Sequence, residues 1–119
     1  MTLRPLLFFS AFWVGTMLPQ HEAPKLSLRD TIDIVADYSV YHPDVPFRQE
    51  WAGWTDPDEQ KMFIVKNLDL TARRRTTIHE LVHVQRRMYR QIADTREAEE
   101  VAVDLITEAT YIELFGAKP

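Results

Sequence analysis

The chain of 119 residues has the length of a single domain, and its 45% hydrophobic and 27% charged residues are typical of a folded globular protein rather than a disordered one. Its net charge of −4 offers no broad basic surface, which argues against nucleic acid as a partner. The absence of cysteine excludes disulfides and cysteine-based zinc sites, so that any metal must be bound by histidine and carboxylate groups.

The first 23 residues differ in composition from the rest. Arg4 precedes an apolar run from Leu6 to Leu18, which Pro19 closes. The run is shorter than the ~20 residues of a membrane-spanning helix and resembles the apolar region of a secretory signal peptide. We therefore predict that residues 1–23 are a signal peptide or an N-terminal membrane-tethering segment of an exported, periplasmic or secreted protein. The alternative is a buried N-terminal helix of a cytoplasmic protein. Residues 24–119 are expected to form one domain.

The first predicted helix of that domain begins at Ser27, with Asp30 three residues later as a capping box, and runs to about Tyr38. Its core face is expected to consist of apolar residues at helical spacing, namely Leu28, Ile32, Val35 and Ala36. The next segment, residues 41–46, contains two prolines and is expected to be a loop. His42 lies in this loop, where a solvated histidine is the ordinary case.

Two segments with strand character follow, residues 47–54 and 61–66, separated by the turn-forming residues 55–59. This pattern predicts an antiparallel β-hairpin. Trp51 and Trp54 are expected to pack on the sheet. In an alternative interpretation, an edge of the hairpin borders a binding site, where an extended peptide could add as a further strand.

A long helix is predicted from Thr71, as N-cap, to Gln91 or Ala93. Arg73, Arg74 and Arg75 are expected to form a solvated helix start rather than a binding patch. Apolar residues at helical spacing are expected to face the core, namely Ile78, Leu81, Val82, Met88 and Ile92.

Within this helix, residues 79–83 read H-E-x-x-H. His79 and His83 are four residues apart, which places both imidazoles on one helix face, about 5–6 Å apart at Cβ and close enough to share one Zn²⁺. Glu80 would then reach a metal-bound water without being a ligand itself. The motif therefore predicts the metal site of a hydrolase.

The last helix is predicted to begin with Asp94 and Glu97 as a second capping box and to end near Phe115, with Gly116 as its stop. Its apolar stripe, which is expected to face the core, consists of Ala98, Val101, Leu105, Ala109 and Ile112.

A catalytic zinc requires a third protein ligand, and this last helix carries the candidates. An antiparallel pairing of the two helices that turns near Asp94 places His83 level with residues 103–105 and His79 level with residues 107–109. We expect Glu100 to be the ligand, and Asp104 to accept a hydrogen bond from the outer nitrogen of His79. The alternatives that stay open are Glu97, Glu99, Asp104 and Glu108. A donor for a developing oxyanion is equally open among Tyr111, Tyr89 and His42.

Residues 55–83, TDPDEQKMFIVKNLDLTARRRTTIHELVH, resemble the core of the ImmA/IrrE-type metallopeptidases. The E-x-x-x-D pair formed by Glu100 and Asp104 is similar to the wider gluzincin pattern of zinc peptidases. This resemblance implies that His79, His83 and a downstream glutamate bind zinc, and that Glu80 is the general base. It also implies an α+β fold of the zincin type, with a β-hairpin packed on the motif helix and a C-terminal ligand helix.

The sequence thus predicts a zinc-dependent metallopeptidase that acts on a peptide or protein substrate. The alternative is a non-catalytic domain on a zincin-like scaffold, which either binds zinc for stability or serves protein interaction. The sequence predicts neither the cleavage specificity nor the oligomeric state.

Overall fold

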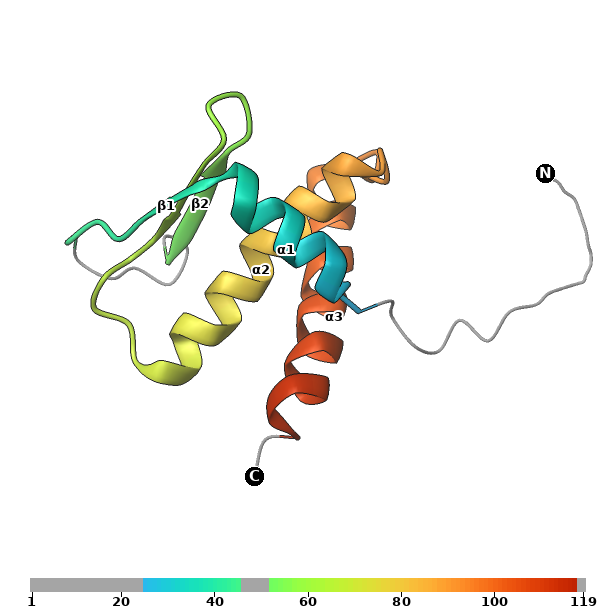
Figure 1. Cartoon of the computed structure of the whole chain (residues 1–119). Coiled ribbons are helices and arrows are strands. Elements are labelled where there is room, and N and C mark those ends of the chain that lie inside the picture. Colours follow the sequence, from blue (N-terminus) through green and yellow to red (C-terminus); the bar gives the residue numbers. More distant parts are fainter. Residues whose placement is uncertain (1–24, 46–51, 118–119) are drawn as a thin grey trace, which may run out of the picture.

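The computed structural model describes residues 25–45 and 52–117, which form an α+β fold of three helices and a three-stranded sheet (Figure 1). The helices are α1 (Leu28–Asp37), α2 (Leu70–Met88) and α3 (Arg96–Phe115). The strands are β1 (Ser39–Tyr41), β2 (Gly53–Asp56) and β3 (Lys61–Ile64). Helix α2 packs against α1, β2, β3 and α3, so the H-E-x-x-H helix is the centre of the fold. The predicted α+β class is confirmed.

The sheet has the strand order β1-β3-β2. Strands β2 and β3 pair in antiparallel fashion, with Thr55 opposite Met62, which confirms the predicted hairpin. Strand β2 extends to Asp56, so the turn occupies residues 57–60 instead of beginning at Thr55. The first part of the predicted strand, residues 47–51, lies outside the described residues. Strand β1 was not predicted. It pairs parallel to β3 over only three exposed residues, which carry no alternation of polar and apolar side chains.

The two faces of the sheet have different partners. Met62 and Ile64 are buried against the helices, as their alternation along β3 requires. On the opposite face, the ring of Phe63 stacks between Tyr41 and Trp54, with centroid separations of 5.4 and 5.0 Å. The expected packing of Trp54 on the sheet is therefore confirmed, whereas Trp51 lies outside the described part of the chain.

Helix α1 begins as predicted, because the hydroxyl of Ser27 accepts a hydrogen bond from the backbone N–H of Asp30. The prediction of its core face was wrong. Asp30 and Ile34 are buried, while the expected residues are exposed, namely Leu28, Ile32, Val35 and Ala36. The orientation follows from the Asp30 carboxylate, which accepts hydrogen bonds from Gln85 Nε2 at 2.9 Å and from the Tyr89 hydroxyl at 2.8 Å, both at the end of α2. A buried acid with two donors holds α1 on α2.

Helix α2 begins one residue before the predicted N-cap, because the carboxylate of Asp69 caps it at the N–H of Ala72 (2.8 Å). Ile78, Leu81 and Val82 are buried as predicted. The helix ends at Met88, earlier than expected, and Arg90 then adopts a positive φ of 56°. Because the chain turns there, Met88 and Ile92 are exposed and do not belong to the core, which corrects their assignment.

Helix α3 has Thr95 as its N-cap, so the predicted capping box of Asp94 and Glu97 was wrong. The predicted end at Phe115 is confirmed, with Gly116 as the stop at a φ of 88°. Its predicted core stripe was wrong: Ala98, Val101, Leu105 and Ile112 are exposed, and Ala109 is half-buried. The buried residues are Val103, Ile106, Thr107, Thr110 and Tyr111. One reason is that the hydroxyl of Thr110 accepts a hydrogen bond from the backbone N–H of Leu26, which turns this side of α3 inward.

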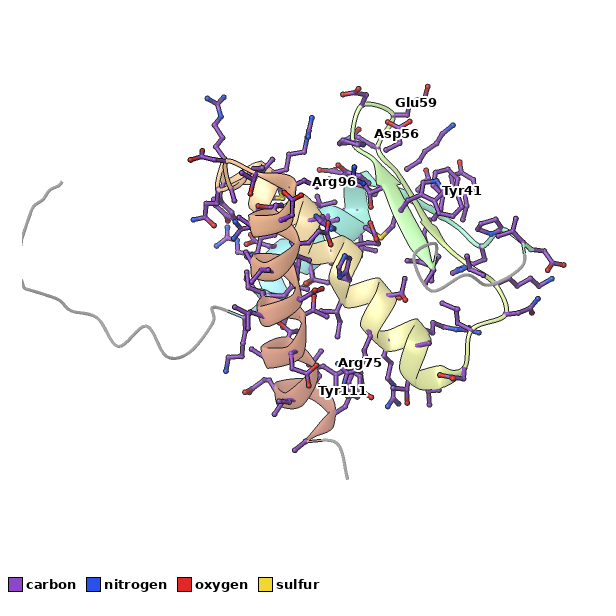
Figure 2. The ribbon with its side chains drawn as sticks, turned by 180° about the vertical axis from the view of Figure 1, so that it is seen from behind. Tyr41, Asp56, Glu59, Arg75, Arg96 and Tyr111 are labelled. Carbon is purple, nitrogen blue, oxygen red and sulfur yellow. The ribbon has the colours of Figure 1, made fainter. Side chains whose placement is uncertain are left out.

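The sequence predicted that the arginines at the start of α2 are solvated, but two of them contact α3. The guanidinium of Arg75 lies 4.1 Å from the ring centroid of Tyr111 and forms an ion pair with Glu108, both on α3 (Figure 2). Arg74 lies 4.0 Å from the ring centroid of Phe115. These contacts join the start of α2 to the end of α3 and fix the antiparallel pairing of the two helices.

Within the described residues, none of the helices combines the length and the apolar character that crossing a bilayer needs. The predicted signal peptide or membrane-tethering segment, residues 1–23, lies outside this part of the chain and stays a prediction.

Candidate metal centre

The two motif histidines project from the same face of α2. Their Nε2 atoms are 3.1 Å apart, and their rings meet edge to face with centroids 4.7 Å apart. About a quarter of each side chain is exposed, 26% for His79 and 28% for His83. The two imidazole nitrogens therefore converge on one point that solvent can reach, which is the arrangement predicted from the spacing of the motif.

Glu100 approaches this point from α3. Its carboxylate oxygens lie 3.6 Å from Nε2 of His79 and 3.5 Å from Nε2 of His83. The three side chains offer ligand atoms that all lie within 4.8 Å of one another. Zinc–nitrogen bonds of 2.0–2.1 Å at the tetrahedral angle place two ligand atoms roughly 3.3 Å apart, and the observed distances fit this value. Two imidazoles and a carboxylate are also a donor set that zinc accepts in proteins.

Glu100 lies beside His83 because α2 ends earlier than predicted. Residue 92 is the midpoint between Met88 and Arg96, so the turn lies two residues earlier than expected and His83 is level with about residue 101. Val103, Thr107 and Thr110 define the inner face of α3, and Glu100 lies on the same side because it precedes Val103 by three residues.

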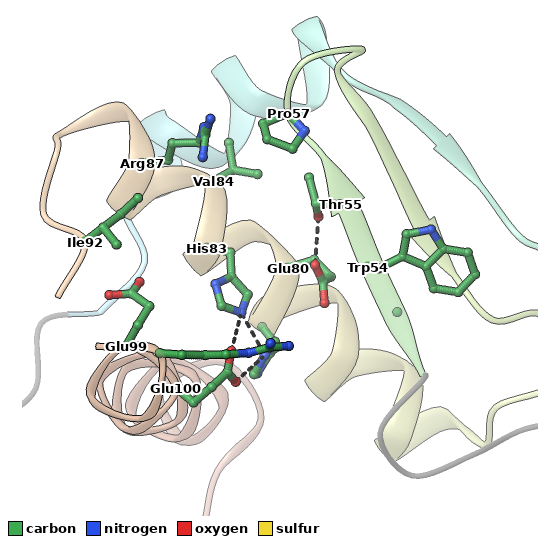
Figure 3. A pocket seen from close by; sticks show the side chains of 13 residues that line it. Trp54, Thr55, Pro57, Glu80, His83, Val84, Arg87, Ile92, Glu99 and Glu100 are labelled. Carbon is green, nitrogen blue, oxygen red and sulfur yellow. Dashed lines mark hydrogen bonds and ion pairs between the residues drawn. The ribbon is translucent and has the colours of Figure 1, made fainter. Parts of the chain in front are cut away.

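Glu99, next to Glu100 on α3, directs its carboxylate to the turn between the two helices and holds that turn (Figure 3). Its carboxylate accepts hydrogen bonds from Arg86 Nε at 2.8 Å and Nη2 at 3.1 Å, and from the backbone N–H of Ala93 at 2.8 Å. The bonds from Arg86 are the main cause that holds the pKa of Glu99 below its ordinary value, because they stabilise the charged form in spite of burial. Glu99 is therefore not available as a metal ligand.

The three other candidate acids on α3 have different positions. Oδ1 of Asp104 lies 3.5 Å from Nδ1, the outer nitrogen of His79, on the side where an orienting group was expected. Glu108 pairs with Arg75. Glu97 is exposed and is not part of the His79, His83 and Glu100 group. The structure thus places Glu100, among the five candidates, at the two imidazoles.

Glu80 is buried beside this group and is held by strand β2. The hydroxyl of Thr55 donates a 2.7 Å hydrogen bond to Oε1 of Glu80 (Figure 3). Sequence reasoning missed Thr55, because residues 55–59 were assigned to a turn. A strand that ran on to Asp56 would have placed Thr55 and Gly53 on one face and Trp54 on the other. That alternation is observed, since the ring of Trp54 points away from His83 and Glu80 (Figure 3).

Two hollows flank the histidines along β2. The larger has a volume of about 660 Å³ and extends from His79 and His83 past Thr55 to Arg96. The smaller, of about 380 Å³, extends from His79 past Gly53 to Asp104 and Glu108. Gly53, His79 and Glu80 line both, so the two hollows adjoin at these residues. In the described sheet β2 is an edge strand, and its residues Gly53, Trp54 and Thr55 border the larger hollow.

The strand can pass this close to α2 only because Gly53 has no side chain. A Cβ atom at this position would lie 2.6 Å from Cγ2 of Thr76 and 2.9 Å from the carbonyl oxygen of Phe63. Both distances are shorter than real Cβ contacts, so Gly53 sets the separation between β2 and the motif helix and thereby the width of the cleft.

The candidate oxyanion donors lie elsewhere. Tyr111 is buried beneath Arg75, the Tyr89 hydroxyl donates to Asp30, and Nδ1 of His42 lies 3.1 Å from the carbonyl oxygen of Ile64. None of the three lines either hollow. The walls do contain groups that the sequence analysis did not single out, Thr55, Arg87 and Arg96. Arg87 and Arg96 carried no signal, because they become neighbours of the motif only through the turn between α2 and α3.

Comparisons of the chain with protein-family models, with curated proteins and with solved structures give no match.

Proposed function

We propose that the protein is a zinc-dependent metallopeptidase. The observation that carries this proposal is the convergence of His79 Nε2, His83 Nε2 and the Glu100 carboxylate within 4.8 Å, beside the buried carboxylate of Glu80. The predicted resemblance to ImmA/IrrE-type and gluzincin peptidases, and with it the zincin-like assignment of the fold, belongs to the same proposal. The peptide or protein substrate is likewise part of this proposal.

In this proposal His79, His83 and Glu100 are the zinc ligands. Bound there, Zn²⁺ would supply Lewis acidity, which lowers the pKa of a coordinated water towards 7 and polarises a substrate carbonyl. The carboxylate of Asp104, 3.5 Å from Nδ1 of His79, orients that imidazole and favours the tautomer with Nε2 directed inward.

Glu80 is the general base. It accepts a proton from the attacking water and then donates it to the amine that leaves as the peptide bond breaks. The hydrogen bond from Thr55 holds one oxygen of the carboxylate, which leaves the second oxygen for proton transfer. The carboxylate is buried, and this restricts the geometries in which it meets the water.

The substrate is proposed to lie along β2. The hollows of about 660 and 380 Å³ extend in both directions from the histidines, so the cleft accommodates peptide on either side of the bond to be cleaved. An extended peptide can pair its backbone with the outer side of the edge strand, as an additional strand of the sheet. A cleft open at both ends favours cleavage within a chain as well as near its terminus.

The number of ligands favours catalysis over a purely structural zinc. A structural zinc is usually bound by four protein groups, whereas a catalytic zinc is bound by three and retains a position for water. Within residues 25–45 and 52–117 the group comprises three side chains, and 47% of the Glu100 side chain is exposed. Water can therefore reach the fourth position.

The proposal is tested with the full chain loaded with one equivalent of zinc and incubated with a mixture of random-sequence peptides, whose products are identified by mass spectrometry. The protein is expected to cleave peptides, and Glu80→Gln is expected to bind zinc stoichiometrically but to lose at least a hundredfold in rate. Hydrolysis that persists undiminished in Glu80→Gln, or a zinc-loaded protein that cleaves no peptide, would contradict the proposed function.

A further inference from the structure

The larger hollow has a wall that faces β2 across the cleft. This wall is formed by the end of α2, the following turn and the start of α3, which contribute Arg87, Ile92 and Arg96. Figure 3 shows Arg87 and Ile92 on the side of the hollow opposite Thr55. Figure 2 shows Arg96 at the first turn of α3, at the same end of the molecule as Asp56 at the end of β2 and Glu59 in the hairpin turn. Two guanidinium groups thus border one side of the proposed metal centre.

The acids of this hollow are already engaged. Glu99 is bound by Arg86, Glu100 faces the histidines, and Glu80 is bound by Thr55. In the proposed enzyme Zn²⁺ balances the charges of Glu80 and Glu100. The charges of Arg87 and Arg96 then have no counter-charge in the wall of the hollow. Within residues 25–45 and 52–117, neither guanidinium lies close enough to an acceptor or an acid to form a hydrogen bond or an ion pair.

Three other arginines on α2 differ from these two. Arg73 donates to the carbonyl oxygens of Lys66 and Leu68, Arg75 pairs with Glu108, and Arg86 pairs with Glu99. These three guanidinium groups therefore stabilise the fold through contacts with other parts of the chain. Within the described part of the chain, the guanidinium groups of Arg87 and Arg96 have no such partner, which leaves them available to a ligand.

With Zn²⁺ balancing Glu80 and Glu100, and with Glu99 paired to Arg86, the two ends of the cleft differ in charge. The smaller hollow, on the other side of His79, is bordered by Asp104 and Glu108, and its one arginine, Arg75, forms an ion pair with Glu108. A cleft with basic groups at one end and acidic groups at the other orients a charged ligand before contact is made. Its basic end attracts an anionic group of the substrate.

We propose that Arg87 and Arg96 bind a carboxylate of the peptide substrate, so that the enzyme prefers peptides with a carboxylate on the larger-hollow side of the cleaved bond. A guanidinium donates two parallel hydrogen bonds to a carboxylate, and a hollow of about 660 Å³ is in the size range of ligand pockets. Apolar neighbours, Val84, Ile92 and Pro57, border the same space and suit the aliphatic part of a side chain. This inference rests on the proposed function.

The carboxylate of the substrate can come from two sources, the C-terminus of a short peptide or the side chain of an aspartate or glutamate. The test therefore uses two libraries of random-sequence decapeptides that differ only in a free C-terminal carboxylate or a carboxamide. Cleavage products from the zinc-loaded full chain are quantified by mass spectrometry. A preference for the free-acid library near its C-terminus identifies the first source, and enrichment of Asp and Glu at one fixed position from the cleaved bond in both libraries identifies the second.

The variants are Arg87→Gln, Arg96→Gln and the double substitution, with Arg90→Gln as the matched control. Arg90 is an exposed arginine of the same turn that does not line the hollow, so its substitution removes the same charge at a similar place. We expect the double variant to lose about tenfold in kcat/KM for the preferred peptide, the effect of about one charge-assisted hydrogen bond, and less than twofold for the matched peptide without the carboxylate. The control keeps the preference.

The outcomes separate this inference from the proposed function. Cleavage of peptides with no preference for a carboxylate, or a preference that survives in the double variant, overturns the carboxylate subsite while the peptidase stands. If no peptide is cleaved, the proposed function fails, and the subsite is judged by fluorescence anisotropy with labelled copies of one decapeptide in free-acid, carboxamide, Glu and Gln forms. Equal affinity for the charged and uncharged forms then overturns the subsite as well.

Discussion

The hydroxyl of Thr55 donates a hydrogen bond of 2.7 Å to Oε1 of Glu80, which joins the edge strand β2 to the motif helix α2 at the proposed general base. The strand that borders the cleft therefore also positions the group that is proposed to move the proton. In the proposed enzyme, a substrate that pairs with β2 and the base Glu80 would both be positioned by this strand.

Replacement of Thr55 by Val removes this hydrogen bond and retains the shape of the side chain. We expect kcat to fall about tenfold, because a hydrogen bond to a charged group contributes ~1.5–3 kcal/mol and part of this serves to orient Glu80. KM and zinc content are expected to stay within twofold. Thr55→Ser keeps the hydroxyl and should restore most of the activity. An unchanged kcat in Thr55→Val would show that the carboxylate is oriented by other groups.

The ligand assignment is tested by zinc stoichiometry after purification without chelators. His79→Ala is expected to lose the metal, and Glu100→Gln to bind zinc at least tenfold more weakly, because a neutral amide replaces a charged oxygen ligand. Glu97→Gln is the matched control, since Glu97 is an exposed acid of the same helix, three residues earlier, and its substitution should leave zinc binding unchanged. One equivalent of zinc in His79→Ala would contradict the assignment.

The Arg86–Glu99 pair should make the stability of the protein depend on pH. The pKa of Glu99 is lowered, chiefly by its hydrogen bonds from Arg86, relative to the ordinary value of 4.5. A lowered pKa in the folded state gives a contribution that is fully present above about pH 4.5 and is lost as the pH falls through the folded value. We expect Glu99→Gln to lower the free energy of unfolding at pH 7 by about 1–3 kcal/mol, because Arg86 is left mostly buried without its partner.

This difference between Glu99→Gln and the wild type should shrink as the pH falls below about 4.5, because the unfolded carboxyl then binds protons that the folded carboxylate, with its lowered pKa, does not yet bind. Chemical denaturation at pH 7 and pH 3, with chelator present to remove the metal contribution, measures it. Glu97→Gln again serves as control. A difference of the same size at pH 3 and pH 7 would mean that the charge of Glu99 does not stabilise the fold.

The sequence predicted those parts of the structure that depend on local signals. Ser27 caps α1, Gly116 ends α3, and the turn residues between β2 and β3 form an antiparallel hairpin, because each of these depends on residues within a few positions of one another. The meeting of His79 with His83 is local in the same sense, since residues four apart share a helix face.

The orientation of the helices depends on partners that are distant in the sequence and was predicted wrongly. On α1 the acid Asp30 is buried, and its carboxylate accepts hydrogen bonds from Gln85 and Tyr89 at the end of α2. On α3 the buried face includes Thr107 and Thr110, which a count of apolar residues leaves out. Glu100 was nevertheless expected beside the histidines, and the buried residue Val103, three positions later, shows why this side of α3 faces α2.

The orientation of α3 can be tested with two substitutions of the same kind. Val103 is fully buried between α3 and α2, whereas Val101, two residues earlier and in the predicted stripe, is 59% exposed. Val103→Ala is expected to lower the free energy of unfolding by about 2 kcal/mol, through lost burial and the cavity that remains. Val101→Ala should change it by less than ~0.5 kcal/mol, as a typical surface substitution does. Denaturant titration of both variants decides the matter, because a larger effect at Val101 would restore the stripe predicted from the sequence and turn Glu100 away from the histidines.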